Sequence, residues 1–162
     1  MKKLVVYYSM HGNSELVAEA ISRVTGADIL RIEPVKAYPD KGAKKFIWGG
    51  KSAVMGETPK LKPYIFDEDK YDSIIIGFPN WASRPAPPIK SFVKEQKEKL
   101  KGKKISVFCC QAGNGAEKAF EKLKKDLEID SFKAELVLID PKLKKENFDE
   151  VKVKEFCERS YT

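Results

Sequence analysis

The sequence predicts an α/β protein built on a doubly wound parallel sheet with helices on both faces. Five short segments rich in β-branched and aromatic residues recur along the 162 residues, and helical patterns fill most of the gaps between them. Strands that alternate with helices form βαβ units, whose crossovers are right-handed almost without exception. The length suits one hydrophobic core, so we expect residues 1–162 to form a single domain.

The first predicted strand is the near-continuous apolar run LVVYY at residues 4–8. Runs of this kind are typical of strands that are buried on both faces of a parallel sheet. The other four strands are predicted at residues 28–33, 73–77, 105–110 and 136–139.

The first predicted helix covers residues 14–25, where apolar residues recur at helical spacing. Gly26 follows it directly, and glycine is common just past the end of a helix. Further helices are predicted at residues 88–100, 115–127 and 148–157.

Residues 34–71 interrupt this alternation, because a helix would normally join the second and third strands. The connection contains four prolines and the pair Gly49-Gly50, and a short helix is predicted around residues 44–55. A connection this long is uncommon unless it is functional or partly ordered. We expect its aromatic side chains to dock on the domain rather than face solvent; they are Tyr38, Phe46, Trp48 and Tyr64.

The composition argues against several functional classes. The formal net charge of +7 would suit nucleic acid, but the lysines alternate with acidic residues on helical stretches and no nucleic-acid module accompanies them. No apolar run approaches the length of a membrane span. We therefore expect a cytoplasmic protein that binds neither nucleic acid nor membrane.

The three cysteines do not predict a disulfide or a zinc site. Cys109 and Cys110 are adjacent on a predicted strand and point to opposite faces, and Cys157 lies far along the chain. The sequence has no C-x-x-C pair and one histidine. We expect no metal, and we expect the thiols to be buried and unreactive.

Three unusual loops leave the carboxyl ends of predicted strands, where open parallel sheets bind their ligands. The first places four hydrogen-bond donors, Ser9, His11, Asn13 and Ser14, around Gly12 at the start of a helix. Backbone amides and the helix dipole favour an anion there. The alternative is that Asn13 or Ser14 only caps the helix.

The second loop, residues 78–88, carries Trp81, which could stack on a flat heterocycle or pack beneath the prolines that follow. The third loop places Gly113 and Gly115 around Asn114 and suits a flat ring held by backbone donors, although such turns are also simply turns. Together the three loops describe a phosphate end and a planar end, the shape of a mononucleotide.

The three stretches resemble the flavodoxin family, of the short-chain type. YYSMHGNSELVAEAI at residues 7–21 resembles the flavodoxin phosphate loop. YDSIIIGFPNWASRPAPPIKSFV at residues 71–93 and KGKKISVFCCQAGNGAEKAFEKLK at residues 101–124 resemble the second and third flavin loops. The resemblance implies a flavodoxin-like three-layer sandwich with a five-stranded parallel sheet in the order 2-1-3-4-5, non-covalent FMN, and one- or two-electron redox chemistry.

Carried over position by position, the resemblance implies three groups of cofactor-binding residues and no catalytic residue. The phosphate would be held by Ser9, His11, Gly12, Asn13 and Ser14. One side of the ring would be flanked by Pro79, Asn80, Trp81, Ala82 and Ser83. Its other edge would be lined by Gln111, Ala112, Gly113, Asn114 and Gly115.

The sequence also departs from the family pattern. His11 stands where the family usually has a hydroxyl residue, and we expect replacing it with alanine to weaken FMN binding. Ala82 leaves room over the ring for a substrate or partner, and the connection that contains Trp48 could cover the site. Flavodoxin carriers are typically acidic, whereas this chain is basic, which favours an acidic partner protein.

Three functions remain open at this stage. The first is a flavodoxin-type carrier that passes electrons to a redox partner protein through FMN. The second is an NAD(P)H-dependent FMN oxidoreductase that acts on quinones or similar small acceptors. The third is a flavin-fold binding module without turnover. A monomer and a homodimer are both compatible with the sequence.

Overall fold

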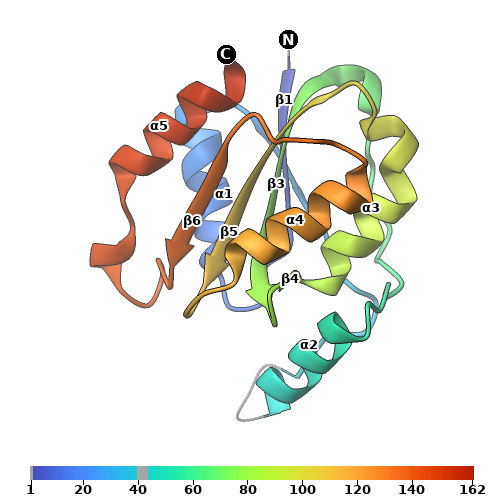
Figure 1. Cartoon of the computed structure of the whole chain (residues 1–162). Helices are drawn as coiled ribbons and strands as arrows, with labels where there is room; N and C mark the ends of the chain where they lie inside the picture. Colours follow the sequence, from blue (N-terminus) through green and yellow to red (C-terminus); the bar gives the residue numbers. More distant parts are fainter. Residues whose placement is uncertain (1, 40–43) are drawn as a thin grey trace.

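The protein is built around five parallel strands, β1 Lys2–Tyr7, β2 Asp28–Arg31, β3 Tyr71–Trp81, β5 Lys104–Gln111 and β6 Glu135–Ile139. The computed structural model describes residues 2–39 and 44–162, with only the backbone for 44–47. The parallel strands lie in the order β2-β1-β3-β5-β6 (Figure 1). This confirms the predicted order 2-1-3-4-5 for the parallel strands.

The sheet has a sixth strand that the sequence analysis did not predict. The two-residue strand β4, Arg84–Pro85, pairs antiparallel with the end of β3, with Trp81 opposite Arg84. Ala82 and Ser83 form the turn at φ 52° and 60°, the left-handed backbone that tight hairpin turns require. Residues 78–81, expected in a loop, therefore belong to β3.

Four helices cover the two faces of the sheet, as predicted. α1 Asn13–Thr25 and α5 Glu150–Tyr161 pack on one face; α3 Pro87–Leu100 and α4 Ala116–Leu127 pack on the other (Figure 1). The pleat of β1 shows why both faces are apolar: Val5 is buried with the first pair of helices and Val6 with the second. The last helix ends at Tyr161 rather than at residue 157.

The long connection contains the helix α2 Lys44–Val54, close to the predicted 44–55. Figure 1 shows α2 beyond the carboxyl ends of the strands. Tyr38 and Tyr64 pack against the core as expected, but Trp48 is 52% exposed, so the expectation is wrong for that residue. The side chain of Phe46 lies outside the described residues.

Two short 3-10 turns, Glu68–Lys70 and Lys145–Asn147, complete the regular structure. Asp149 begins α5 by accepting a hydrogen bond from the Lys152 N–H at 3.0 Å, which explains why this helix starts later than predicted. Within the described ranges, none of the helices has the length and apolar character to span a membrane.

All three cysteines are buried and free, as predicted. Burial raises the pKa of the Cys110 thiol to about 12 and that of Cys157 to about 11. Burial also raises the pKa of Cys109. Thiols with such pKa values carry almost no thiolate at neutral pH, so they are poor nucleophiles.

Gly77, in the middle of β3, tests how tightly the sheet is packed. A Cβ added there would lie 2.0 Å from the ring of Phe108, which is buried against α1 and α5. We expect Gly77→Ala to lower the free energy of unfolding by about 3 kcal/mol, measured by urea denaturation. Gly113→Ala is the matched control, because its Cβ would meet no atom within 4 Å; equal stability of the two variants would contradict this packing.

Candidate functional site

The three predicted loops meet at the carboxyl edge of the sheet. The second and third are joined directly by Asn80, whose Nδ2 donates to Gln111 Oε1 at 3.2 Å and to the Asn114 carbonyl at 2.8 Å. Tyr8, at the end of the first strand, contacts Trp81 of the second segment, with ring centroids 5.7 Å apart. The structure therefore brings residues from all three segments together.

The first loop forms an open helix start rather than a side-chain cap. Gly12 is the N-cap of α1 at φ 93°, and no side chain caps the helix. The Gly12 N–H donates back to Ser9 Oγ at 3.0 Å, and Asn13 Oδ1 accepts from the Lys142 N–H at 2.9 Å. The cap alternative is therefore not what the structure shows. First-turn N–H groups left without a side-chain acceptor can serve an anion.

Ser14 supplies a second sign that this loop holds a ligand. Its side chain is 1% exposed, and its Oγ has no hydrogen-bond partner in the described ranges. The Cys110 thiol is a polar neighbour of this oxygen, and its pKa is raised by burial and lowered less by a weak interaction with the Ser14 hydroxyl. A buried hydroxyl without a partner costs about 1–3 kcal/mol. A ligand that bonds to this oxygen would recover that free energy.

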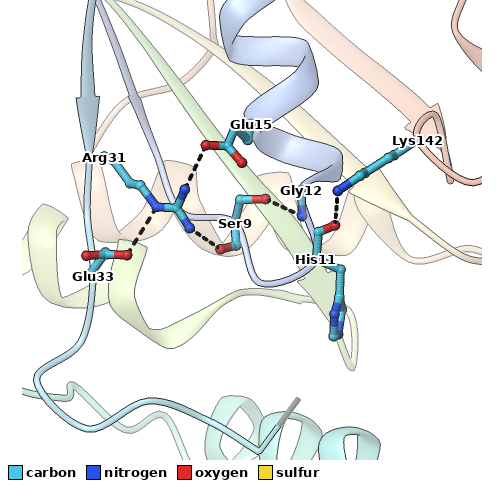
Figure 2. A network of polar contacts seen from close by, with 7 residues as sticks. All are labelled: Ser9, His11, Gly12, Glu15, Arg31, Glu33 and Lys142. Carbon is cyan, nitrogen blue, oxygen red and sulfur yellow. Dashed lines mark hydrogen bonds and ion pairs between the residues drawn. The ribbon is translucent and has the colours of Figure 1, made fainter. Parts of the chain in front are cut away.

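Lys142 contacts the same loop from another part of the chain and was missed by the sequence analysis. It follows β6, and its Nζ donates to the His11 carbonyl at 3.1 Å (Figure 2). A Cβ on Gly12 would lie 2.5 Å from this Nζ, and the φ of 93° at Gly12 is a backbone conformation that favours glycine. The available signal was its position just after the fifth strand, at the same sheet edge as the other loops.

Arg31 is a second cation that the sequence analysis missed. Its Nη2 donates to the Ser9 carbonyl at 3.3 Å, and its guanidinium pairs with Glu15 at 2.8 Å and Glu33 at 3.2 Å (Figure 2). Two carboxylates therefore balance this charge. Lys142, by contrast, has no carboxylate within 4.0 Å among the residues described. Lys142 is thus the cation better placed to attract an anion.

His11 is exposed, and its imidazole extends away from Ser9 and Gly12 in Figure 2. Its main-chain carbonyl, rather than its ring, makes the contact with Lys142. The expected contribution of the ring to phosphate binding stays a prediction.

Trp81 is half-buried and packs edge-on against two tyrosines. Tyr38 meets it edge-on, with centroids 5.2 Å apart and an interplanar angle of 86°, and Tyr8 does so at 89°. A Cβ on Gly49 of α2 would lie 3.2 Å from the indole. The helix and the hairpin therefore approach each other here.

The buried Tyr8 and the half-buried Tyr38 complete this aromatic wall. Burial raises the pKa of Tyr8 and of Tyr38, so both phenols stay protonated at neutral pH. The Tyr38 hydroxyl lies 3.1 Å from Ser52 Oγ, which donates to Glu57 Oε2 at 2.5 Å. This chain of hydrogen bonds ties the end of α2 to the wall.

The third loop depends on Gly115. It is the N-cap of α4 at φ 103°, and a Cβ there would lie 2.4 Å from Ser83 Oγ. Gln111 Oε1 accepts from the Ala116 N–H at 3.0 Å as well as from Asn80. Asn80 Oδ1 is buried and has no hydrogen-bond partner in the part of the chain that is described, so it is free to accept from a ligand.

The fifteen predicted residues lie on the three segments, in two classes of exposure. Those at least partly buried are Ser9, Gly12, Asn13, Ser14, Pro79, Asn80, Trp81, Ser83, Gln111 and Gly115. Those exposed are His11, Ala82, Ala112, Gly113 and Asn114. Their individual contacts with a cofactor stay predictions.

The comparison with known families agrees with this geometry. The family model for flavodoxin matches residues 2–160. The chain belongs to the flavodoxin family. This membership supports FMN, the cofactor that the sequence analysis predicted.

Solved structures show the same fold at low sequence identity. The flavoprotein from Lactobacillus acidophilus, solved in complex with FMN, aligns with a TM-score of 0.71 and 20% identity over 91% of this chain and 99% of its own. A Bacteroides uniformis protein aligns with a TM-score of 0.74 and 20% sequence identity over 97% of both chains. Two-electron reduced flavodoxin from Megasphaera elsdenii aligns with a TM-score of 0.58 and 20% sequence identity over 98% of this chain and 97% of its own.

The residues of this flavodoxin-family chain fit FMN at both ends. The buried Ser14 hydroxyl and the open helix start suit a phosphate, and the orphaned Asn80 Oδ1 beside the aromatic wall suits the polar edge of a flat ring. Gly12 and Gly115 keep the backbone clear at both loops.

Replacing Lys142 tests its role at the phosphate end. We expect Lys142→Met to weaken FMN binding roughly fivefold at low salt, because it removes an ammonium charge beside the loop. Riboflavin, which lacks the phosphate, should bind the variant and the original protein equally. Fluorescence titration measures both affinities, and an equal loss for the two flavins would contradict a phosphate-specific role.

Proposed function

We propose that this protein binds FMN non-covalently and transfers electrons through it. The observation that carries the proposal is the open start of α1, where, among the residues described, no side chain caps the helix and the buried Ser14 Oγ has only the Cys110 thiol beside it. It lies on the loop that Lys142 contacts, at the same sheet edge as the Trp81 and Gly115 segments. The family match and the FMN complex of the Lactobacillus acidophilus flavoprotein support this assignment.

Each part of the site has a separate task. Ser14, the first-turn N–H groups of α1 and Lys142 would hold the phosphate. The Asn80 amide, fixed by Gln111 and Asn114, would present Oδ1 to the polar edge of the ring. FMN, when bound, supplies the one- and two-electron chemistry. The protein contributes binding, orientation and the electrostatics that set the redox potential.

The aromatic wall would limit contact between the ring and water. Tyr8 and Tyr38 hold Trp81 from two sides, and their raised pKa values keep them neutral. Neutral phenols add no negative charge beside a ring that gains electrons, and such a charge would oppose reduction.

An absorbance titration tests the cofactor. Apoprotein mixed with FMN should develop a bound-flavin spectrum and quench the flavin fluorescence with one-to-one stoichiometry. A protein that neither purifies with a yellow colour nor takes up added FMN would refute the proposal. Midpoint potentials then test the redox role: an electron-transfer protein should shift them from those of free FMN, whereas unchanged potentials would favour a binding module without turnover.

Ser14→Ala separates the phosphate role from a structural one. The substitution removes a buried hydroxyl that has no partner, so the apoprotein should keep its stability or gain slightly. FMN should nevertheless bind about tenfold more weakly, equivalent to about 1.4 kcal/mol. Urea denaturation and FMN titration measure the two effects, with Ser22→Ala on the same helix as control. A destabilised apoprotein with unchanged FMN affinity would assign Ser14 to the core alone.

A further inference from the structure

A cavity of about 120 Å³ lies beside the β3–β4 hairpin. It is lined by β4 and the start of α3 on one side and by α4 and residues at and after the end of α2 on the other. Its charged lining comprises four cations and two carboxylates: Arg84, Lys90, Lys122, Lys125, Glu57 and Asp126. No step of the proposed function uses these residues.

The charges around this cavity are not paired with one another. On the same two helices, Lys97, Lys99 and Lys124 each form an ion pair with a glutamate. In the described ranges, none of the six charged lining residues forms an ion pair within 4.0 Å. The lining therefore carries an excess of two positive charges that no ion pair among the described residues neutralises.

Lys122 lies close to other cations of the cavity. Its Nζ donates to the Ser83 carbonyl at 3.2 Å, which holds the ammonium against the hairpin. Burial lowers the pKa of Lys122, and the nearby positive charge of Arg84 lowers it further. An anion in the cavity would reverse this repulsion.

The cavity adjoins the segment predicted to flank the flavin ring. Arg84 pairs with Trp81 in the hairpin. The Ser83 carbonyl accepts a hydrogen bond from Lys122. The Ser83 side chain lies where a Cβ on Gly115 would otherwise be. A molecule held in the cavity would thus touch the same two-stranded hairpin that carries Trp81.

We propose that this cavity binds a phosphate group of a small molecule that exchanges electrons with the flavin. The guanidinium of Arg84 can engage two phosphate oxygens, and the ammonium groups of Lys122 and Lys125 add charge. The volume admits one compact anionic group rather than an extended surface. The two carboxylates, Glu57 and Asp126, are placed to accept hydrogen bonds from hydroxyl groups of the molecule that carries the phosphate.

The electron-exchange role rests on the proposed function, whereas phosphate binding does not. A phosphate group could come from free phosphate or from a nucleotide such as NADP⁺. Both sources present the same phosphate group to the cavity. The affinities of the protein for free phosphate and for NADP⁺ distinguish them.

Isothermal titration of the protein saturated with FMN, so that the first loop is already filled, with inorganic phosphate and with NADP⁺ at constant ionic strength set by chloride, tests the site. We expect the double variant R84Q/K122Q to bind phosphate at least ~10-fold more weakly than the original protein. Lys133→Gln, an exposed lysine elsewhere, should bind it unchanged. A nucleotide site should bind NADP⁺ more tightly than phosphate, with the same loss in the double variant.

Several results would overturn the proposal. The first is that R84Q/K122Q and the original protein bind phosphate equally, and the second is that phosphate does not bind beyond the chloride background. The third is that hexaglutamate binds more tightly than phosphate, which would assign the face to an acidic protein. If the double variant does not fold, Lys125→Gln should still weaken phosphate binding about threefold. FMN affinity should be unchanged in R84Q/K122Q. Failure of the original protein to bind FMN would refute the proposed function and leave phosphate binding intact.

Discussion

Burial of the central strands on both faces is the constraint on which the rest of the structure depends. Val5 and Val6 of β1, and Ile75 and Ile76 of β3, face opposite layers of helices and are fully shielded from water. A sheet covered on both faces has no surface left for a ligand except its edges and ends. Because all five long strands are parallel, their carboxyl ends fall together, and the polar loops are brought to one place.

Glycines without room for a side chain connect this framework to the site. Gly115 allows the third loop to reach Ser83, and Gly12 allows the first loop to pass beneath Lys142. The Asn80 amide then fixes the second and third loops relative to each other through Gln111 and Asn114. The loops are therefore held by the protein itself, and two acceptors, Ser14 Oγ and Asn80 Oδ1, remain unused. Such preorganisation lowers the entropy cost of binding.

The sequence predicts the parallel strands, their order and the three loops because these follow from periodicity and from local residue types. It predicts less well where partners are distant in the chain. The hairpin strand β4 is two residues long and forms only because Trp81 and Arg84 pair across a tight turn. Trp48 was expected to dock on the domain but is exposed. Its exposure depends on how α2 is oriented relative to the sheet, which no local sequence pattern encodes.

Lys142 shows the same limit at the site. It lies 130 residues after Gly12, and an isolated lysine after a strand has no pattern that distinguishes it from a surface lysine. Arg31 is equally hidden, although its two carboxylate partners could be guessed from charge alone. Both residues reach the first loop because β2 and β6 end at the same edge as β1. Topology, rather than sequence spacing, brings these cations to the loop.

The distribution of charge adds a final step to this argument. The net charge is +7, and some of the cations are neutralised by ion pairs. Arg31, Lys97 and Lys124, for example, each form an ion pair with a glutamate. Lys142 at the first loop and the cations around the hairpin cavity form no ion pair within 4.0 Å in the described ranges. Surface ion pairs contribute little to stability, so their pairing elsewhere mainly neutralises the field. The cations at the first loop and at the cavity therefore leave positive charge at these two places, which favours anionic groups there.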